Sequence, residues 1–327
     1  MAWTVGQTLQ NGKYLIEKEL GRERFGITYL ARDEQGNEFV IKTLHEDKLK
    51  QLTPAEQDSL KSKFVDEARK LEGCKYPHIV KIHKTFIEGQ LYCLAMEYIH
   101  GDSLANLVSR VFSEKEALGY IEQIGDALIK IHGKGLLHRN IKPANIRVRT
   151  NQSEAVLIDF DLAGEFDYPF IYRWQNEPFA PIELNSQKIL TGACTDVYSL
   201  AATLYVLLTG KLPASALKRT EGKADLIPPK VINPHISKRV NHAIIKGMEL
   251  DPTHRPQTMQ EWLNLLGLRR SFAIALPKQP RWAVAVEILG VVGILAAVVS
   301  TNINVLGFLE RHILPPSEKV MPFEENR

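Results

Sequence analysis

The hydrophobic pattern of this chain changes once, near residue 100, and this change limits the folds open to it. Before that point, short runs typical of β-strands alternate with turn signals, at Tyr14–Leu20, Ile27–Arg32, Glu38–Leu44, Ile79–Ile87 and Leu91–Tyr98. One helical stretch, Pro54–Gly73, interrupts them and repeats apolar residues on one helix face, at Leu60, Phe64, Ala68 and Leu71. From Ser103 onward, apolar residues recur with helical spacing. The pattern therefore predicts an α+β chain with a β-rich lobe, a helical lobe and a cleft between them.

Composition excludes some classes of function. The net charge is +3 and the basic residues are scattered, so we expect no nucleic-acid partner. The three cysteines lie far apart and show no metal-ligand spacing, which favours a reducing compartment. No apolar stretch follows the first residues, so we expect no secretory signal.

A second change in composition occurs late in the chain. After a basic, proline-containing linker (269–281), residues 282–301 are almost wholly apolar and are followed by a short tail (302–327). About 20 apolar residues span a bilayer as a helix, and the basic flank places residues 1–281 in the cytoplasm by the positive-inside rule. We therefore expect a single-pass membrane protein. The alternative is a buried or amphipathic helix docked on the domain, and Glu287 is the one discordant residue in the apolar segment.

Several short motifs follow one another in a specific order between residues 14 and 268. They are Leu20-Gly21 through Gly26, Val40-Ile41-Lys42, Glu67, His138-Arg139-Asn140-x-Lys142-x-x-Asn145, Asp159-Phe160-Asp161, Ala180-Pro181-Ile182-Glu183, Asp196 and Arg255-Pro256. Their order and spacing resemble the eukaryotic-type (Hanks-type) serine/threonine protein kinase family, in particular its bacterial and cyanobacterial members. The resemblance implies a two-lobed kinase-like domain with an N-lobe at about 14–99 and a C-lobe at about 100–268, preceded by a lead at 1–13.

The resemblance also implies a binding site for ATP and magnesium or manganese. Lys42 would hold the α- and β-phosphates, and Glu67 would orient Lys42 through an ion pair. Asp159 and Asn145 would take the metal ions. The resemblance assigns the remaining nucleotide-binding positions to Gly21, Gly26, Val40, Met96, Glu97 and Ile99. Met96 would be the gatekeeper behind the adenine base.

Other matching positions have structural roles in the family. His138 and Phe160 would stack on each other, and Asp196 would hold the catalytic loop against a helix. Glu183 and Arg255 would form a buried ion pair. These roles require no phosphoryl transfer.

The catalytic loop departs from the family pattern. Asn140 stands where the family has the aspartate that accepts the substrate proton, while Lys142 is retained. An amide oxygen accepts a hydrogen bond but takes up no proton near neutral pH, and general-base help is worth about 10²–10⁴ in rate.

Further departures affect the segments on either side of the catalytic loop. The glycine-rich loop carries Glu23 and Arg24, Asp161 replaces a glycine, and Asn176 stands where the family has a threonine. The segment from Asp159 to Glu183 contains no serine or threonine. Arg139, which clamps a phosphorylated loop in relatives, therefore has no phosphorylatable serine or threonine to meet there.

Three interpretations follow from these observations. The first is a membrane-anchored pseudokinase that acts as a scaffold or allosteric regulator of protein partners and binds ATP weakly. The alternative is a weakly active serine/threonine kinase, so the assignment as an enzyme stays open. In the third, the membrane helix is the main functional element, as Glu287 would favour, and the kinase-like domain only docks.

Overall fold

The structure is a computed structural model that describes residues 3–22, 26–108, 111–162, 177–185 and 191–268. All of these residues fall in one compact unit, 1–269. The expected membrane segment, 282–301, lies outside the described residues. Among the helices that are described, none is long and apolar enough to cross a bilayer.

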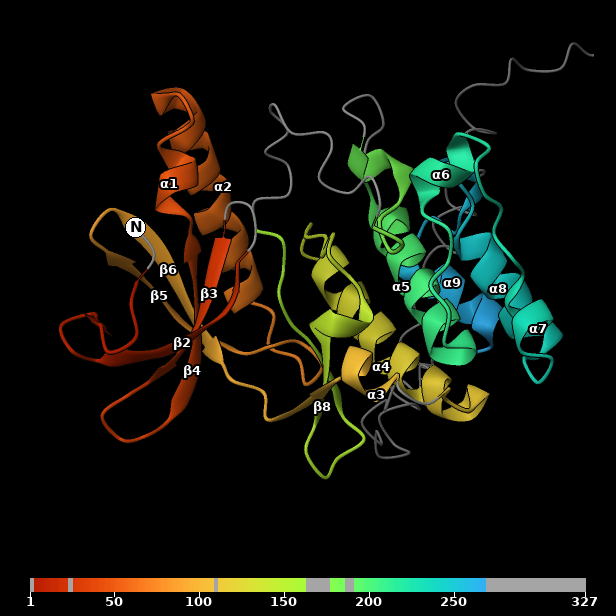
Figure 1. Cartoon of the computed structure of the whole chain (residues 1–327), viewed down its shortest axis with the longest axis horizontal. Helices are drawn as coiled ribbons and strands as arrows, with labels where there is room; N and C mark the ends of the chain where they lie inside the picture. Colours follow the sequence, from red (N-terminus) through yellow and green to blue (C-terminus); the bar gives the residue numbers. More distant parts are fainter. Residues whose placement is uncertain (1–2, 23–25, 109–110, 163–176, 186–190, 269–327) are drawn as a thin grey trace, which may run out of the picture. The chain divides into compact units, whose positions relative to one another are not determined.

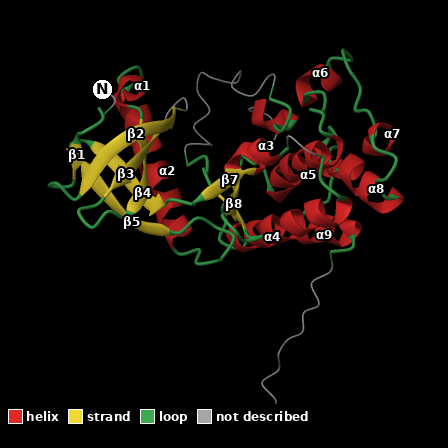
Figure 2. Cartoon of the chain, turned by 60° about the horizontal axis from the view of Figure 1, so that its bottom comes forward, coloured by secondary structure: helices red, strands yellow, loops and turns green. Residues whose placement is uncertain are grey.

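The N-terminal lobe is built on an antiparallel six-stranded sheet with the order β1-β2-β3-β4-β6-β5 (Figures 1 and 2). Its strands are β1 (Thr8–Leu9), β2 (Tyr14–Arg22), β3 (Gly26–Arg32), β4 (Glu38–Leu44), β5 (Ile82–Glu88) and β6 (Leu91–Glu97). The predicted lobe is thus confirmed, although β5 begins three residues later than the hydrophobic run suggested. Ile79 instead makes an isolated bridge with Leu157.

Helix α2 (Pro54–Glu72) covers one face of this sheet and follows the short α1 (Glu46–Leu49) (Figure 1). Thr53 and Glu56 form a reciprocal capping box at the start of α2, and Pro54 occupies its first turn. The four residues expected on its apolar face are all buried in the main core, at Leu60, Phe64, Ala68 and Leu71. A second apolar cluster, which includes Tyr14, Tyr29 and Phe86, contains buried residues of β1–β6.

The C-terminal lobe is mainly helical. It contains α3 (Leu104–Leu107), α4 (Glu114–His132), α5 (Ala193–Thr209), α6 (Ala216–Thr220), α7 (Pro229–Ile232), α8 (Lys238–Gly247) and α9 (Met259–Leu266). Within the described part of this lobe, 3₁₀ turns lie at Pro143–Asn145, Ile182–Asn185 and Pro252–His254. Ser113 caps α4 by accepting a hydrogen bond from the Glu116 N–H at 3.3 Å. Every described side chain of α5 from Cys194 to Thr209 is buried, so this helix forms the centre of the lobe.

A small three-stranded sheet lies next to the helices of the C-terminal lobe. Its strands β7 (Gly101–Ser103), β8 (Ile146–Arg149) and β9 (Ala155–Leu157) pair in that order. β7 directly follows the connection from β6, and β8 directly follows the 3₁₀ turn at Pro143–Asn145. The small sheet therefore lies between the hinge, which we define as Glu97–Ile99, and the motifs that the sequence assigns to a metal ion.

Candidate active site

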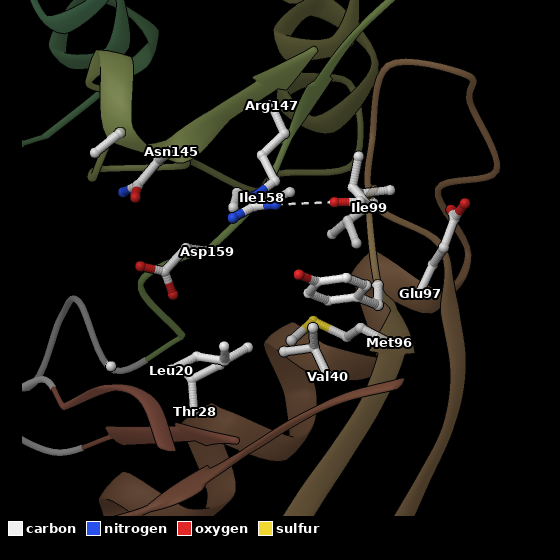
Figure 3. Close-up of a pocket in the computed structure, with 14 residues that line it drawn as sticks. Leu20, Thr28, Val40, Met96, Glu97, Ile99, Asn145, Arg147, Ile158 and Asp159 are labelled. Atoms are coloured by element: carbon white, nitrogen blue, oxygen red, sulfur yellow. Dashed lines mark hydrogen bonds between the residues drawn. The ribbon is translucent and has the colours of Figure 1, made fainter. Parts of the chain in front are cut away.

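A cavity of about 250 Å³ lies where the motifs of both lobes converge (Figure 3). Leu20, Gly21, Thr28 and Val40 come from β2, β3 and β4, and Met96, Glu97, Tyr98 and Ile99 from the end of β6 and the hinge. The other walls are Val80, Ala144, Asn145, Arg147, Ile158 and Asp159. The lining combines apolar side chains with a few charged and amide groups, which is the usual composition of a small-molecule site.

The hinge is tied to β8 by charge. Arg149 donates to both carboxylate oxygens of Glu97, at 2.7 and 3.2 Å, and also to Glu154 at 3.1 Å. The Glu97 N–H donates to the Lys81 carbonyl at 2.9 Å. The Glu97 side chain is thus a structural partner of β8, and Glu97, Tyr98 and Ile99 all line the cavity.

Lys42 is almost fully buried and joins the two lobes. Its Nζ donates to Asp159 Oδ1 at 2.7 Å and to the Phe160 carbonyl at 2.8 Å. Asp159 has a φ of +60°, in the left-handed region that side chains rarely adopt. Such strained residues concentrate at functional sites, and here the strain coincides with the carboxylate that the sequence assigns to a metal ion.

Glu67 contacts the catalytic loop. Its Oε1 accepts a hydrogen bond from Arg139 Nη1 at 3.1 Å, so α2 is linked to the residue before Asn140. Arg139 is buried and also has a positive φ, +58°. The arginine that the sequence left without a phosphorylated partner therefore has a carboxylate partner from the other lobe.

Asp196 binds the backbone of the catalytic loop. Its carboxylate accepts the backbone N–H groups of His138 and Arg139, both at 2.9 Å, and His132 Nε2 lies 2.8 Å away. Burial is the largest single influence and opposes its ionisation, but the hydrogen bonds and charges of His132 and His138 together lower the pKa of Asp196. Asp196 is thus an anionic anchor for a loop whose backbone is strained at Arg139.

Asn140 is buried, and its amide lies beside Asp159. Its Nδ2 is 3.5 Å from both the carbonyl oxygen and Oδ2 of Asp159. This distance is at the outer limit of a hydrogen bond. The side chain at the expected base position therefore presents a donor to the carboxylate that would bind metal.

The oxygen donors of Asn145 and Asp159 suit a magnesium or manganese ion. Asn145 Nδ2 donates to the Asn140 carbonyl at 2.8 Å, which fixes the amide and leaves its oxygen as the acceptor. Among the described residues, no cluster of three or more histidine, cysteine, aspartate or glutamate side chains could form a complete metal site. A metal held by two protein oxygens and by phosphate oxygens fits this arrangement, because magnesium keeps few protein ligands.

The residues with expected structural roles lie next to one another. The ring centroids of His138 and Phe160 are 4.4 Å apart. Burial lowers the pKa of His138, so this ring is favoured in its neutral form. Arg255 donates to both oxygens of Glu183, at 2.6 and 3.0 Å, and both side chains are fully buried.

The assigned positions are not all part of the cavity wall. Gly21, Val40, Met96, Glu97, Ile99, Asn145 and Asp159 line it, whereas Gly26, Lys42, Glu67, Asn140 and Lys142 do not. Asn140 and Lys142 instead border a separate, much smaller space together with Phe179 and Ser199. Asp161 is buried. Glu23, Arg24 and Asn176 lie outside the described residues.

Sequence reasoning missed Arg147, which lines the cavity from β8. A signal was present, because the strand alternation Ile146-Arg147-Val148-Arg149 places both arginines on the less buried face. Leu20, Thr28, Val80 and Ile158 were also not assigned to the cavity from the sequence.

Comparison with known proteins identifies the family. The family model for the protein kinase domain matches residues 14–264. The chain belongs to the protein kinase domain family. It is similar to the probable serine/threonine-protein kinase CPE1738 of Clostridium perfringens (29% identity, 79% of this chain and 38% of that protein). It is also similar to the serine/threonine-protein kinase PrkC of Bacillus subtilis (28% identity, 77% and 39%). The chain thus spans less than two fifths of the length of these relatives.

Solved structures support the same fold. PpkA-294 in its apo form superimposes with a TM-score of 0.65 at 24% identity, covering 81% of this chain and 99% of that one. Rad53 1–466 in complex with AMP-PNP gives a TM-score of 0.62 at 21% identity, covering 78% and 65%. These likenesses establish the two-lobed kinase architecture.

Proposed function

We propose that this protein is a pseudokinase that binds ATP with a divalent metal ion and regulates protein partners without efficient phosphoryl transfer. The observation that carries the proposal is Asn140, because its amide Nδ2 faces Asp159 from the position of the catalytic base. Around it, the fold and the groups that would bind a nucleotide are retained.

Nucleotide binding is supported by the residues on either side of the cavity. A base would lie against the hinge at Glu97–Ile99, and the phosphates would extend toward Asn145 and Asp159 at the other end (Figure 3). Lys42 already donates to Asp159 at 2.7 Å, so its ammonium is within reach of a phosphate or metal bound there. Bound magnesium or manganese would neutralise phosphate charge.

The loss of transfer follows from the chemistry of the amide. Asn140 can position a hydroxyl group through a hydrogen bond, but it cannot remove the proton. General-base help contributes about 10²–10⁴ in rate, which corresponds to roughly 3–5 kcal/mol of the activation barrier. A site that binds and orients ATP without that help is suited to a conformational signal.

A weakly active serine/threonine kinase is the second candidate. It is favoured by the retained Lys42, Asn145 and Asp159, and by relatives that are named serine/threonine-protein kinases. In this case Asn140 would only orient the substrate hydroxyl.

We further propose that residues 282–301 anchor the domain to a membrane as a single helix, with the kinase domain in the cytoplasm. The support is the apolar sequence with its basic flank. The test is carbonate extraction of the full-length protein beside a variant that lacks residues 282–301. Extraction of the intact protein into the soluble fraction would contradict the anchor.

Phosphoryl transfer by the full-length protein tests the pseudokinase function. Wild type, Lys42→Met and Asn140→Asp are incubated with magnesium or manganese ATP, and incorporated phosphate is counted on the protein and on a general protein substrate. The proposal predicts that wild type equals Lys42→Met. Incorporation by wild type clearly above Lys42→Met would establish the enzyme instead. A gain of activity in Asn140→Asp would identify Asn140 as the lesion that prevents transfer.

A further inference from the structure

Arg147 brings a cation into the wall of the nucleotide cavity. It is half-buried, stands on β8, and lines the cavity together with Ile158 (Figure 3). Leu20, Thr28 and Val40 lie on the other side of the cavity in the same view. A flat group in the cavity would therefore have Arg147 and Ile158 on one side and aliphatic carbons on the other.

The hinge holds the guanidinium of Arg147 in place. Nη1 donates to the carbonyls of Ile99 at 3.0 Å and Gly101 at 2.9 Å, which accounts for both of its N–H groups (Figure 3 shows the first bond). The guanidinium carbon also lies 5.7 Å from the centroid of the Tyr98 ring. These contacts fix the guanidinium group before any ligand arrives.

The backbone at Gly101 makes this geometry possible. Gly101 has a φ of +142°, and a Cβ there would lie 1.9 Å from the Val148 carbonyl oxygen. Only glycine permits the hinge to approach β8 this closely. The approach places the Gly101 carbonyl within reach of Arg147.

Arg147 and Arg149, which lie on the same strand, differ in their hydrogen-bond partners. Arg149 is bound by the carboxylates of Glu97 and Glu154. Among the residues that the structure describes, no carboxylate forms an ion pair with Arg147. Its partners are neutral carbonyls, so its positive charge persists at the cavity wall.

We propose that Arg147 forms one face of the base-binding slot and recognises a purine base by stacking its guanidinium on the ring. The proposal rests on the proposed nucleotide binding and deepens it by naming the group that selects the ligand. A planar cation attracts the face of an electron-rich aromatic ring, and arginine planes stack on nucleobases in this way. A purine offers a larger face than a pyrimidine, so the stack favours adenine over cytosine.

Equilibrium titration of the full-length protein with adenosine, ADP, ATP and CTP tests the proposal. The variants are Arg147→Leu, which removes the cation, and Arg147→Lys, which keeps the charge but loses the planar group. Arg149→Leu is the matched control, because it removes an arginine of the same strand that holds the hinge but does not line the cavity. Thermal melting without ligand establishes whether each variant is folded. If Arg147→Leu does not fold, the binding measured for Arg147→Lys tests the proposal instead.

The expected result is specific to the base. Arg147→Leu should lower the affinity for adenosine, ADP and ATP by the same factor, on the order of tenfold. It should also reduce the ratio of the affinities for ATP and CTP. Arg147→Lys should also lower the affinity for the adenine ligands and the preference for ATP over CTP. Arg149→Leu should leave both within about twofold of wild type.

Other outcomes overturn the inference. Unchanged binding of adenine nucleotides by Arg147→Leu would mean that the Arg147 side chain does not contribute to affinity. Tighter binding would mean that it obstructs the nucleobase. A loss that grows from adenosine to ATP would place the guanidinium on the phosphates. An equal loss in Arg149→Leu would assign the effect to the hinge. If neither wild type nor any variant binds a nucleotide, the proposed nucleotide binding itself fails, and the inference fails with it.

Discussion

Two groups of polar residues in this domain differ in what holds them in place. The first lies around α5, where Glu183 and Arg255 form a fully buried ion pair and Asp196 accepts hydrogen bonds from the catalytic-loop backbone. The second lies in the cleft, where Lys42 pairs with Asp159, a residue that is 26% exposed, and where Asn140 stands at the base position. An unpaired charge inside the core is costly, so we expect removal of one partner in the first group to destabilise the fold strongly. We expect the cleft group to contribute less to the free energy of unfolding.

Breaking the buried pair should produce the largest effect. Arg255→Met leaves the Glu183 carboxylate, which also accepts a hydrogen bond from Thr195 Oγ1, without its charged partner. We expect a loss of about 3–5 kcal/mol in the free energy of unfolding, measured by urea denaturation of the full-length protein. Glu183→Gln is the control and should cost less, because Arg255 keeps its bonds to the carbonyls of Glu249, Leu250 and Cys194. A loss below about 1 kcal/mol in Arg255→Met would abolish the distinction between the two groups.

The corresponding change in the cleft should cost less. Asp159→Asn removes the charged acceptor of Lys42, but the Phe160 carbonyl remains a partner of Nζ. We expect a loss of about 1.5–3 kcal/mol in the free energy of unfolding without ligand, the range for a hydrogen bond to a charged group. If urea denaturation gave a larger loss than Arg255→Met, the cleft pair would be the more important structural element.

The partly exposed ion pair between Glu97 and Arg149 should contribute less to stability than either of these pairs. Glu97 and Arg149 retain about a quarter of their side-chain exposure, 28% and 25%. Glu97→Gln should therefore lower the free energy of unfolding by about 1 kcal/mol or less, and the difference from wild type should shrink at high salt. A difference that is insensitive to salt would mean that the pair behaves as a buried one.

A pH dependence should be the smallest effect. Burial, followed by the charge of Arg22, lowers the pKa of His45 below its ordinary value of 6.5, and its Nε2 lies 2.9 Å from Arg22 Nη1. The unfolded chain then binds more protons than the folded one below pH 6.5, so stability falls as the pH drops through that value. The slope from this residue is at most about 1.4 kcal/mol per pH unit. Urea midpoints between pH 7.5 and 5.5 should fall for wild type and fall less for His45→Gln, and equal slopes would exclude His45 as the cause.

The sequence predicted most of the fold because hydrophobic spacing reports which side chains are buried. It located α2 and its buried face, and four of the five predicted strands lie within two residues of the observed ones at each end. This spacing does not mark the start of α5. The helix begins at Ala193, and the buried Thr195 and Asp196 in its first turns lack the apolar spacing that marks a helix.

The site was less completely predicted because contacts across the cleft depend on geometry that spacing does not encode. The motifs located Asn140, Asn145 and Asp159, but they did not indicate that Glu67 contacts Arg139. They also omitted Arg147, which occupies no motif position and lines the cavity from β8, where it donates to the Gly101 carbonyl.

The most direct test of the central claim is a titration of the full-length protein with magnesium ATP in which transferred phosphate is counted in the same samples. The account predicts saturable binding that weakens in Asp159→Asn, with phosphate incorporation no higher than in Lys42→Met. Incorporation that rises with ATP occupancy in wild type, and is absent from Lys42→Met, would contradict it and establish a working kinase.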